Sequence, residues 1–337
     1  MSFSSTDEIA QSSHQQRYLT TSTSFGHVIV MIAMGICRRI TCGIDLKKRL
    51  LVYFCIIVFG GIVSDFAPPI IRAFMPLKVS KHNFFNQWFV KIGWLWTLVL
   101  LTPFLVMISD ILRLTRNEEQ QNEIEAKFLV NSKGIPSLSQ SVDVQTKPRT
   151  VLELVKQNAK SEYFVRIAIN TFVWWFITNF FEWYDSYSAS CSIAAHKNRE
   201  VCVRSGGKWA GFDISGHTFL LLFSNLIILE ECVAMVGWES FGDQLNAKQQ
   251  HYQKIYRENY QQHIMFSRYI IPIRILFILL TLLSILWDFM LVQTALFYHT
   301  MIQKFIAFLF ALSLWFLLYK LIYKYLNVAV PHLNSRQ

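Results

Sequence analysis

The feature that most constrains this chain is a set of six long apolar segments separated by polar stretches. A helix needs about 20 mainly apolar residues to cross the hydrocarbon core of a bilayer. Since a helix satisfies every backbone polar group within one segment, we predict six transmembrane helices. The predicted spans are 49–67, 87–109, 163–183, 217–238, 269–298 and 300–323. A shorter apolar stretch, 27–37, is predicted to form an interfacial helix.

The composition agrees with an all-α polytopic membrane protein. Hydrophobic residues make up 53% of the chain and charged residues only 16%, whereas about a quarter of a soluble domain is charged. In a soluble protein the net charge of +10 would suggest nucleic acid. In a membrane protein it indicates loops that face the cytosol and anionic lipid. We therefore expect a membrane as partner and no nucleic acid.

The charge of the loops predicts the orientation of the chain. With the N-terminus in the cytosol, the cytosolic parts hold 19 Lys and Arg residues and the opposite side holds 7. Because positive side chains are enriched on the cytosolic side, this bias places both termini in the cytosol. The predicted organisation is a cytosolic N-terminal extension (1–48), two transmembrane helices (49–109), a cytosolic and partly disordered loop (110–162), four more transmembrane helices (163–323) and a cytosolic tail (324–337).

Two histidines stand at predicted helix ends on the same membrane surface. His217 opens the fourth span, in "FDISGH", and His299 lies between the fifth and sixth spans. The topology therefore permits them to meet, although they are 82 positions apart. Two imidazoles at one membrane–water boundary suit attack on a phosphoryl group and protonation of its leaving group. For either histidine alone, a role as a helix cap or an interfacial residue remains the alternative.

Several polar residues near these histidines are candidates for binding phosphate. Arg204 and Lys208 precede the first histidine, and Lys304 follows the second. Such cations can clamp a phosphate, or they are solvated loop charges. Ser215 places a hydroxyl at a predicted helix N-terminus, which is an anion-binding position. Asp213 is expected to cap that helix rather than to orient an imidazole.

Four polar residues fall inside the predicted spans: Asn225, Glu230, Glu231 and Asp288. At 1.5 Å per residue, the two glutamates lie about 20 Å from the histidine that opens their span, and the aspartate about 16 Å from the second histidine. They are therefore too deep to touch the histidines. Such groups pair with one another or line a chamber that accommodates lipid, and we favour a structural role.

Two of the six cysteines lie in the loop predicted on the lumenal side. Cys191 and Cys202 are 11 positions apart, and in an oxidising compartment they can form a disulfide. The alternative is a pair of reduced thiols. The lumenal histidines and thiols show no ligand spacing, so the sequence predicts no metal and no other cofactor.

With these residues in place, the sequence resembles the fat storage-inducing transmembrane (FIT) family. The resemblance covers about 60–325 and rests on four features of the chain. They are "FFNQWFVKIGWLWTLVLLTPF" (84–104), the loop between the two lumenal cysteines, "GKWAGFDISGHTFLL" (207–221) followed by the glutamates at 230–231, and "TALFYHTMIQK" (294–304). It implies six spans in a helical bundle like that of the lipid phosphate phosphatases, both termini in the cytosol, the membrane of the endoplasmic reticulum, and storage of neutral lipid in droplets.

The resemblance also implies an activity on the lumenal face. Family members are described as cleaving fatty acyl-CoA at the diphosphate to acyl 4′-phosphopantetheine and adenosine 3′,5′-bisphosphate. The family's catalytic histidines correspond to His217 and His299. By analogy with lipid phosphate phosphatases, His299 attacks phosphorus and His217 protonates the leaving group. The phosphatase Lys-x6-Arg-Pro motif is absent here, and Gln293 and Gln303 stand where those enzymes carry Arg and Asp. We therefore expect a different phosphate clamp and modest turnover.

Two functions are compatible with these predictions. The first is an acyl-CoA diphosphatase that supports lipid droplet biogenesis and lipid homeostasis of the endoplasmic reticulum. The alternative is a non-enzymatic protein that binds triacylglycerol or diacylglycerol and partitions neutral lipid into droplets. A transporter fits less well, because the sequence shows neither an internal repeat nor paired broken helices.

Overall fold

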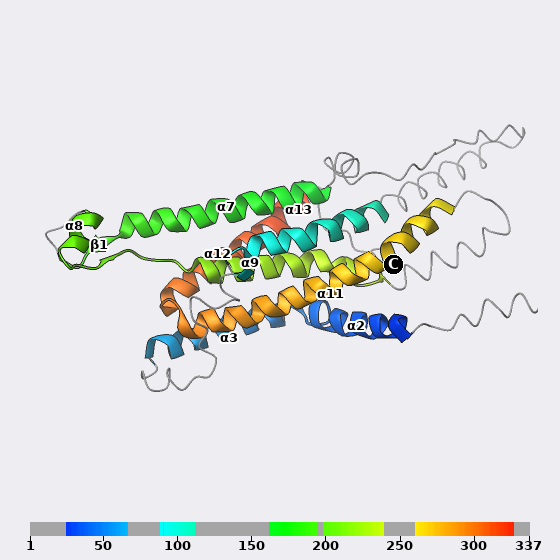
Figure 1. Cartoon of the computed structure of the whole chain (residues 1–337), viewed down its shortest axis with the longest axis horizontal. Helices are drawn as coiled ribbons and strands as arrows, with labels where there is room; N and C mark the ends of the chain where they lie inside the picture. Colours follow the sequence, from blue (N-terminus) through cyan, green and yellow to red (C-terminus); the bar gives the residue numbers. More distant parts are fainter. Residues whose placement is uncertain are drawn as a thin grey trace, which may run out of the picture.

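The protein is a bundle of long helices that run side by side along the longest axis of the molecule (Figure 1). The computed structural model describes residues 25–66, 88–89, 91–111, 162–193, 198–238 and 260–326. Within these residues, six helices are long and apolar enough to cross a membrane: Leu46–Phe66, Gly93–Ile111, Glu162–Ser188, Gly216–Met235, Arg268–Phe297 and Met301–Tyr325. The predicted all-α architecture with six spans is confirmed.

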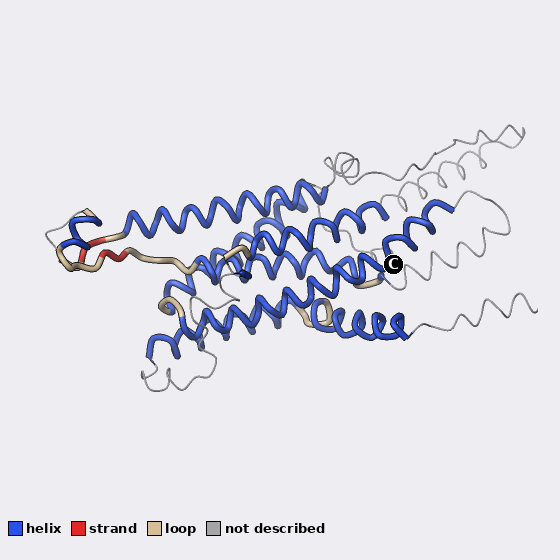
Figure 2. The backbone as a smooth tube through the Cα atoms, viewed as in Figure 1, coloured by secondary structure: helices blue, strands red, loops and turns tan. Residues whose placement is uncertain are grey.

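The helices begin and end close to their predicted limits, and the elements between them are short (Figure 2). The second span differs most: it begins at Gly93, because Lys91 and Ile92 form a turn. The labelled elements, which include the spans, are α2 (Phe25–Thr41), α3 (Leu46–Phe66), α7 (Glu162–Ser188), β1 (Ser190–Cys191), α8 (Arg199–Arg204), β2 (Trp209–Ala210), α9 (Gly216–Glu231), η2 (Cys232–Met235), α11 (Tyr260–Phe297), α12 (Met301–Phe316), η3 (Leu317–Ile322) and α13 (Tyr323–Tyr325).

Helix α9 forms the centre of the bundle. Every residue from Thr218 through Leu229 is buried, and the helix packs against α7, α11 and α12. The surrounding helices carry apolar side chains on their outer faces, for example Leu51 at 62% exposed and Phe59 at 68%. An apolar exterior around an apolar core is what a bilayer requires of a helical bundle. The chain is therefore a multi-pass membrane protein.

Two adjacent glycines bring α3 close to the end of α11 and the start of α12. A Cβ atom at Gly60 would lie 2.7 Å from the Cβ of Ala295, and one at Gly61 would lie 2.5 Å from the Cγ of Met301. Small residues at a helix interface let two backbones approach closely. The end of α3 is thus held against the turn that joins α11 to α12.

The apolar stretch predicted as an interfacial helix forms α2, which is longer than expected. It packs along α11 (Figure 1). It buries Met34 and exposes Ile29, Ile32 and Ile36 on its outer face. Its position relative to the membrane surface stays a prediction.

The polar residues inside the spans form two buried groups. In the first, Arg166 donates from Nε and Nη2 to Glu231 at 2.8 and 2.7 Å, and Tyr319 of the π-helical η3 donates to the same carboxylate at 2.9 Å. Both charged side chains are at most 1% exposed. Beside them, Lys320 pairs with Glu230 at 2.7 Å and is partly exposed.

The second group lies nearer the middle of the bundle and joins α3, α9 and α11. The amide of Asn225 donates to Asp288 at 2.6 Å and to the hydroxyl of Tyr53 at 2.9 Å. The Tyr53 hydroxyl donates to the same aspartate at 2.8 Å, and Ser284 donates to the amide oxygen of Asn225 at 2.5 Å. The expected structural role of these residues is consistent with such contacts, because each polar group is paired with another across a helix interface.

Three predicted segments fall largely outside the described residues. These are the first part of the N-terminal extension (1–48), most of the loop 110–162 and most of the tail 324–337. Their predicted boundaries and cytosolic position therefore stay predictions.

Candidate active site

A cavity of about 1080 Å³ lies where α9 begins and α11 gives way to α12. His217 and His299 both line it. In Figure 1 the start of α9 and the turn between α11 and α12 lie toward the same end of the molecule, the end that also carries α8 and β1. The fold thus brings together two histidines that are far apart in the sequence.

The first histidine is held in the first turn of α9. The N-cap residue is Ser215, whose hydroxyl accepts a hydrogen bond from the Thr218 backbone N–H at 3.3 Å. The Ser215 backbone N–H donates to the carbonyl of Gln303 in α12 at 3.4 Å, so the start of α9 is tied to the element that follows the second histidine. The expectation that Asp213 caps the helix is wrong, because the helix begins at Gly216 and the cap position falls on the serine.

The second histidine lies in the turn between α11 and α12. His299 has a φ of 58°, a left-handed conformation that only a few per cent of residues other than glycine adopt, although histidine does so more often than most. Contacts from α3 and α12 support it. Ser64 donates to the His299 carbonyl at 3.3 Å, Asp65 accepts from the Met301 backbone N–H at 2.9 Å, and the Gln303 side chain accepts from the Thr300 backbone N–H at 2.9 Å.

A carboxylate stands beside this imidazole. Asp213 Oδ2 lies 3.5 Å from His299 Nδ1, which is an ion-pair distance, with the histidine 18% exposed and the aspartate 62%. A carboxylate at Nδ1 favours the tautomer that carries its proton there and leaves the lone pair on Nε2. The sequence allowed such a role for Asp213 but favoured capping, because the two residues come from segments 86 positions apart.

The candidate phosphate-binding residues lie elsewhere. Arg204 and Lys208 are exposed on the loop that precedes α9, and Lys304 is buried, with its ammonium donating to the Ala295 carbonyl at 2.7 Å. Ser215 is buried and uses its hydroxyl as the helix cap. None of these four lines the cavity; the lysine among its lining residues is Lys91.

Lys91 was not among the predicted site residues, although its position in the sequence is unusual. It is the only Lys or Arg within the predicted span 87–109, and an ionisable residue inside a predicted span is more often functional than incidental. The structure places it in the turn just before the helix Gly93–Ile111, where its side chain is exposed and reaches the cavity.

The remaining lining residues divide into a polar and an apolar part. Glu182 and Asp185 from the end of α7 add negative charge, and Tyr298 adds a phenol. Burial raises the pKa of Tyr298 above its ordinary value, so the phenol stays protonated at neutral pH and can donate a hydrogen bond. Apolar walls come from Leu220 and Met290, among others. The cavity therefore combines a charged mouth with a wall that suits a hydrocarbon chain.

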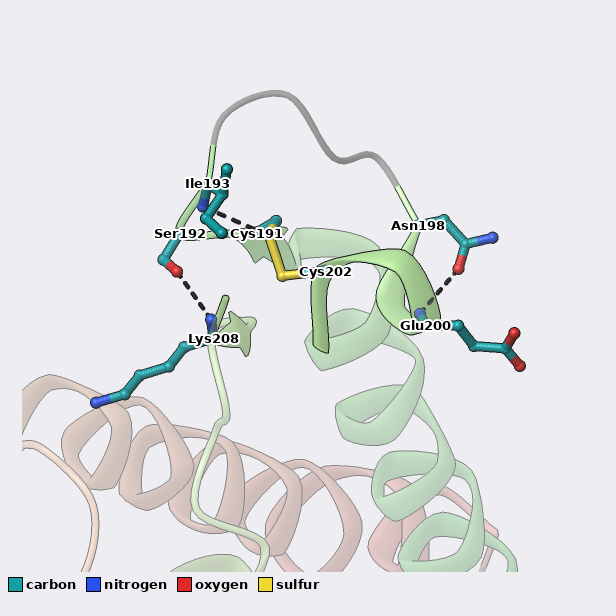
Figure 3. The surroundings of a disulfide bond; sticks show 7 residues. All are labelled: Cys191, Ser192, Ile193, Asn198, Glu200, Cys202 and Lys208. Atoms are coloured by element: carbon teal, nitrogen blue, oxygen red, sulfur yellow. Dashed lines mark hydrogen bonds between the residues drawn. A yellow bond between two sulfur atoms is a disulfide. The ribbon is translucent and has the colours of Figure 1, made fainter. Parts of the chain in front are cut away.

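The loop before α9 is closed by a disulfide between Cys191 and Cys202, whose Cα atoms are 5.8 Å apart (Figure 3). Strands β1 and β2 pair antiparallel beside it. The Ser192 backbone N–H donates to the Lys208 carbonyl at 2.9 Å, and the Lys208 backbone N–H donates to the Ser192 hydroxyl at 2.8 Å. The Lys208 side chain extends away from the disulfide. The disulfide and the strand pair thus make this loop a small folded unit that directly follows the C-terminal end of α7.

The intramembrane polar residues do not belong to the cavity. Asn225, Glu230, Glu231 and Asp288 are absent from its lining and form the paired groups described above. In the part of the chain that the structure describes, no group of three His, Cys, Asp or Glu side chains is placed to hold a metal ion.

This geometry defines a class of protein, a multi-pass helical membrane protein in which two histidines line one cavity. Comparison with known families matches residues 75–188 and 182–319 to the family described as fat storage-inducing transmembrane protein, FIT. The match covers well over half of the chain, and the chain belongs to the FIT family.

Three relatives show how far the similarity extends, and each is named acyl-coenzyme A diphosphatase FITM2. The protein of Drosophila melanogaster is 28% identical over 314 residues, which are 89% of this chain and 64% of that protein. The human protein is 26% identical over 267 residues, covering 76% and 78% of the two chains. The Caenorhabditis elegans protein is 26% identical over 246 residues, covering 73% and 69%. This chain thus spans less than two thirds of the fly relative. No solved structure matches it, so its likeness to the lipid phosphate phosphatases stays a prediction.

Proposed function

We propose that this protein hydrolyses fatty acyl-CoA at the diphosphate, releasing acyl 4′-phosphopantetheine and adenosine 3′,5′-bisphosphate. The observation that carries the proposal is that His217 and His299, 82 positions apart, line one cavity of about 1080 Å³. The names of the relatives, acyl-coenzyme A diphosphatase, support the same reaction.

The geometry suggests a role for each imidazole. Asp213 at Nδ1 of His299 leaves the Nε2 lone pair as nucleophile. Nε2 forms a bond to one phosphorus while the bridging P–O bond breaks, and His217 gives its proton to the departing phosphate oxygen. Water then cleaves the P–N bond, with His217 accepting the proton of the water. The enzyme returns to its starting state and no cofactor is consumed.

Lys91 is our candidate for the cation that holds the diphosphate. Glu182, Asp185 and Asp213 also line the cavity, so the anionic substrate enters a site that carries more acidic than basic side chains. A lysine at the mouth offsets part of this charge and can bond a phosphate oxygen directly. The single lysine accords with the modest turnover expected from the sequence.

The decisive experiment uses the purified full chain in lipid nanodiscs with a long-chain acyl-CoA. The products, adenosine 3′,5′-bisphosphate and acyl 4′-phosphopantetheine, are measured by mass spectrometry. The control is His332→Ala, at a histidine of the predicted cytosolic tail. We expect the wild type and this control to release both products, and His217→Ala and His299→Ala to release about a hundredfold less or none. If the wild type releases no more than the two cavity variants, the protein is not this enzyme.

We further propose that the cavity faces the lumen of the endoplasmic reticulum and that both termini face the cytosol. The excess of Lys and Arg on the predicted cytosolic side supports this orientation, as does a disulfide in the opposite loop. The sequence contains no Asn-x-Ser/Thr site. A glycosylation site inserted between residues 193 and 198 therefore reports on this loop alone. An unmodified loop would place the cavity in the cytosol.

Neutral lipids remain the second candidate partners. The apolar wall of the cavity, with Trp174, Trp175 and Phe181 among its residues, suits an acyl chain of any esterified lipid. If the protein partitions triacylglycerol or diacylglycerol without catalysis, binding of a radiolabelled lipid will persist in His217→Ala and His299→Ala. Under the enzymatic proposal, droplet formation in cells requires both histidines.

A further inference from the structure

A glutamine of α11 stands out among the buried polar groups of this protein. Gln293 is fully buried and lines the cavity. Neither its amide nitrogen nor its amide oxygen has a hydrogen-bond partner among the residues that the structure describes. A buried amide without partners is unfavourable, so this side chain contributes little to the fold as it stands.

Gln293 differs from the other buried polar groups that lack a partner among the described residues. Among the described residues, Gln293 is the one with two unsatisfied side-chain atoms, its amide nitrogen and its amide oxygen. The indole N–H of Trp174, which also lines the cavity, is unsatisfied as well. By contrast, the unsatisfied hydroxyl of Ser224 belongs to a residue outside the cavity. Within the described residues this neutral donor and acceptor pair has no protein partner, and an occupant of the cavity can satisfy it.

The position of the amide relative to the histidines limits what this occupant is. Gln293 precedes His299 by six positions, which is about 9 Å along a helix. Since α11 runs into the bundle from that turn, the amide lies on the deep side of the reacting centre. Leu220 and Met290 also line the cavity. A neutral amide in such surroundings does not offset the charge of a diphosphate, but it does match a neutral polar group within an otherwise apolar chain.

In fatty acyl-CoA, the part that would reach this depth is the pantetheine arm. Moving from the diphosphate toward the thioester, the arm carries two secondary amides. They lie five and nine bonds from the phosphorus, roughly 6 and 11 Å in an extended chain. A secondary amide offers one N–H and one carbonyl, which pair with the carbonyl and N–H of a glutamine side chain.

We propose that the side-chain amide of Gln293 hydrogen-bonds a secondary amide of the pantetheine arm, and so selects acyl-CoA over other lipid diphosphates. The inference rests on the proposed diphosphatase function. It adds a specificity-determining residue at a defined place on the substrate, between the histidines and the wall that receives the acyl chain.

The test compares two substrates that release the same product. One is a long-chain acyl-CoA. The other is a 3′-phospho-ADP esterified directly to a long-chain alcohol, which retains the diphosphate and the hydrocarbon but lacks the pantetheine amides. Adenosine 3′,5′-bisphosphate is measured for both with the full chain in nanodiscs. For Gln293→Met, a replacement of similar size, we expect kcat/KM for acyl-CoA to fall about tenfold or more. For the alkyl substrate it should change less than about threefold.

The control is Ser224→Ala, which removes a buried unsatisfied polar group outside the cavity and should leave both substrates unaffected. Gln293→Met should also melt at the same temperature as the wild type or higher. An equal loss on both substrates, or no loss on either, overturns the role of Gln293, and so does a large drop in melting temperature. If the wild type cleaves neither substrate, the diphosphatase proposal itself fails and the assignment of Gln293 fails with it.

Discussion

At the scale of single residues, the site depends on a turn that the chain would not adopt without support. His299 lies at a positive φ, a conformation that costs about 1 kcal/mol or more for a residue with a Cβ atom. The hydrogen bonds from Ser64 and to Asp65 offset that cost. Residues of another helix thereby set the orientation of the imidazole, and Asp213 lies beside its Nδ1 atom.

The aspartate should act on the rate of the reaction more than on the affinity for substrate. Asp213→Asn removes the charge that favours the reactive tautomer of His299 and stabilises its cationic form. Because the aspartate is 62% exposed and 3.5 Å away, we expect kcat to fall by no more than about tenfold, with KM little changed. Glu200→Gln, an exposed acid on α8, is the matched control. A loss confined to KM would assign Asp213 to substrate binding instead.

The two candidate phosphate clamps make opposite predictions. If Lys91 holds the diphosphate, Lys91→Ala should raise KM for acyl-CoA about tenfold or more, and Lys91→Arg should restore part of the loss. Arg204→Ala and Lys208→Ala, on the disulfide-closed loop, should change KM less than about twofold. The reverse pattern would return the clamp to the two loop cations, which the sequence offered either as a phosphate clamp or as solvated charges.

At the scale of elements, the site requires α3 to lie close to the turn between α11 and α12. Gly60 permits that approach, because a side chain there would meet Ala295 at 2.7 Å and its backbone carbonyl at 3.1 Å. Asp65, one and a half turns further along α3, then reaches the backbone N–H of Met301. The geometry of the cavity thus depends on a helix that contributes no residue to the cavity lining.

Enlarging this glycine should therefore damage stability and activity together. We expect Gly60→Leu to lower the stability of the bundle by about 1–3 kcal/mol through overpacking and to remove most activity by displacing the turn. The melting temperature and acyl-CoA hydrolysis are the two measurements. Phe59→Leu, at an adjacent position that is 68% exposed, is the control and should keep both. Full activity in Gly60→Leu would show that the turn does not depend on α3.

At the scale of the whole molecule, the two ends of the bundle differ in what they contain. One end carries the cavity. The first buried polar group lies away from it, where Arg166 and Glu231 pair between α7 and α9, and Tyr319 joins them from η3. A fully buried ion pair contributes little net stability against an apolar pair, but breaking it leaves an unpaired buried charge. This pair therefore orders the helices around α9 rather than taking part in the chemistry.

Single and double substitutions should separate these effects. Arg166→Met or Glu231→Leu alone should cost about 3–5 kcal/mol, whereas the double variant should recover much of the loss. Thermal unfolding in detergent is the measurement. Glu230→Gln is the control: it removes the charge paired with Lys320, in a pair whose lysine is 40% and whose glutamate is 12% exposed, and should cost about 1 kcal/mol, less than either single substitution. A double variant no more stable than the worse single one would mean that the pair itself is required.

Much of the architecture was predictable from the sequence because a transmembrane helix is a local structure. The described limits of the spans fall within a few residues of the prediction except at Gly93, where Lys91 and Ile92 form a turn instead of extending the helix. The shared location of His217 and His299 was predictable for a related reason: counting spans assigns each helix end to one surface.

What the sequence by itself determined is the number of spans, their lengths and the surface on which each polar residue emerges, since hydrophobicity acts on each segment separately. Only the tertiary structure decided which of those polar residues share the cavity. Lys91, Asp213 and Gln293 reach it. Lys304 instead donates to the Ala295 carbonyl, and Arg204 lies in the loop region that the disulfide closes. The physical reason is that side-chain partners across a bundle depend on helix rotation and close approach, which packing around α9 sets and no single segment encodes.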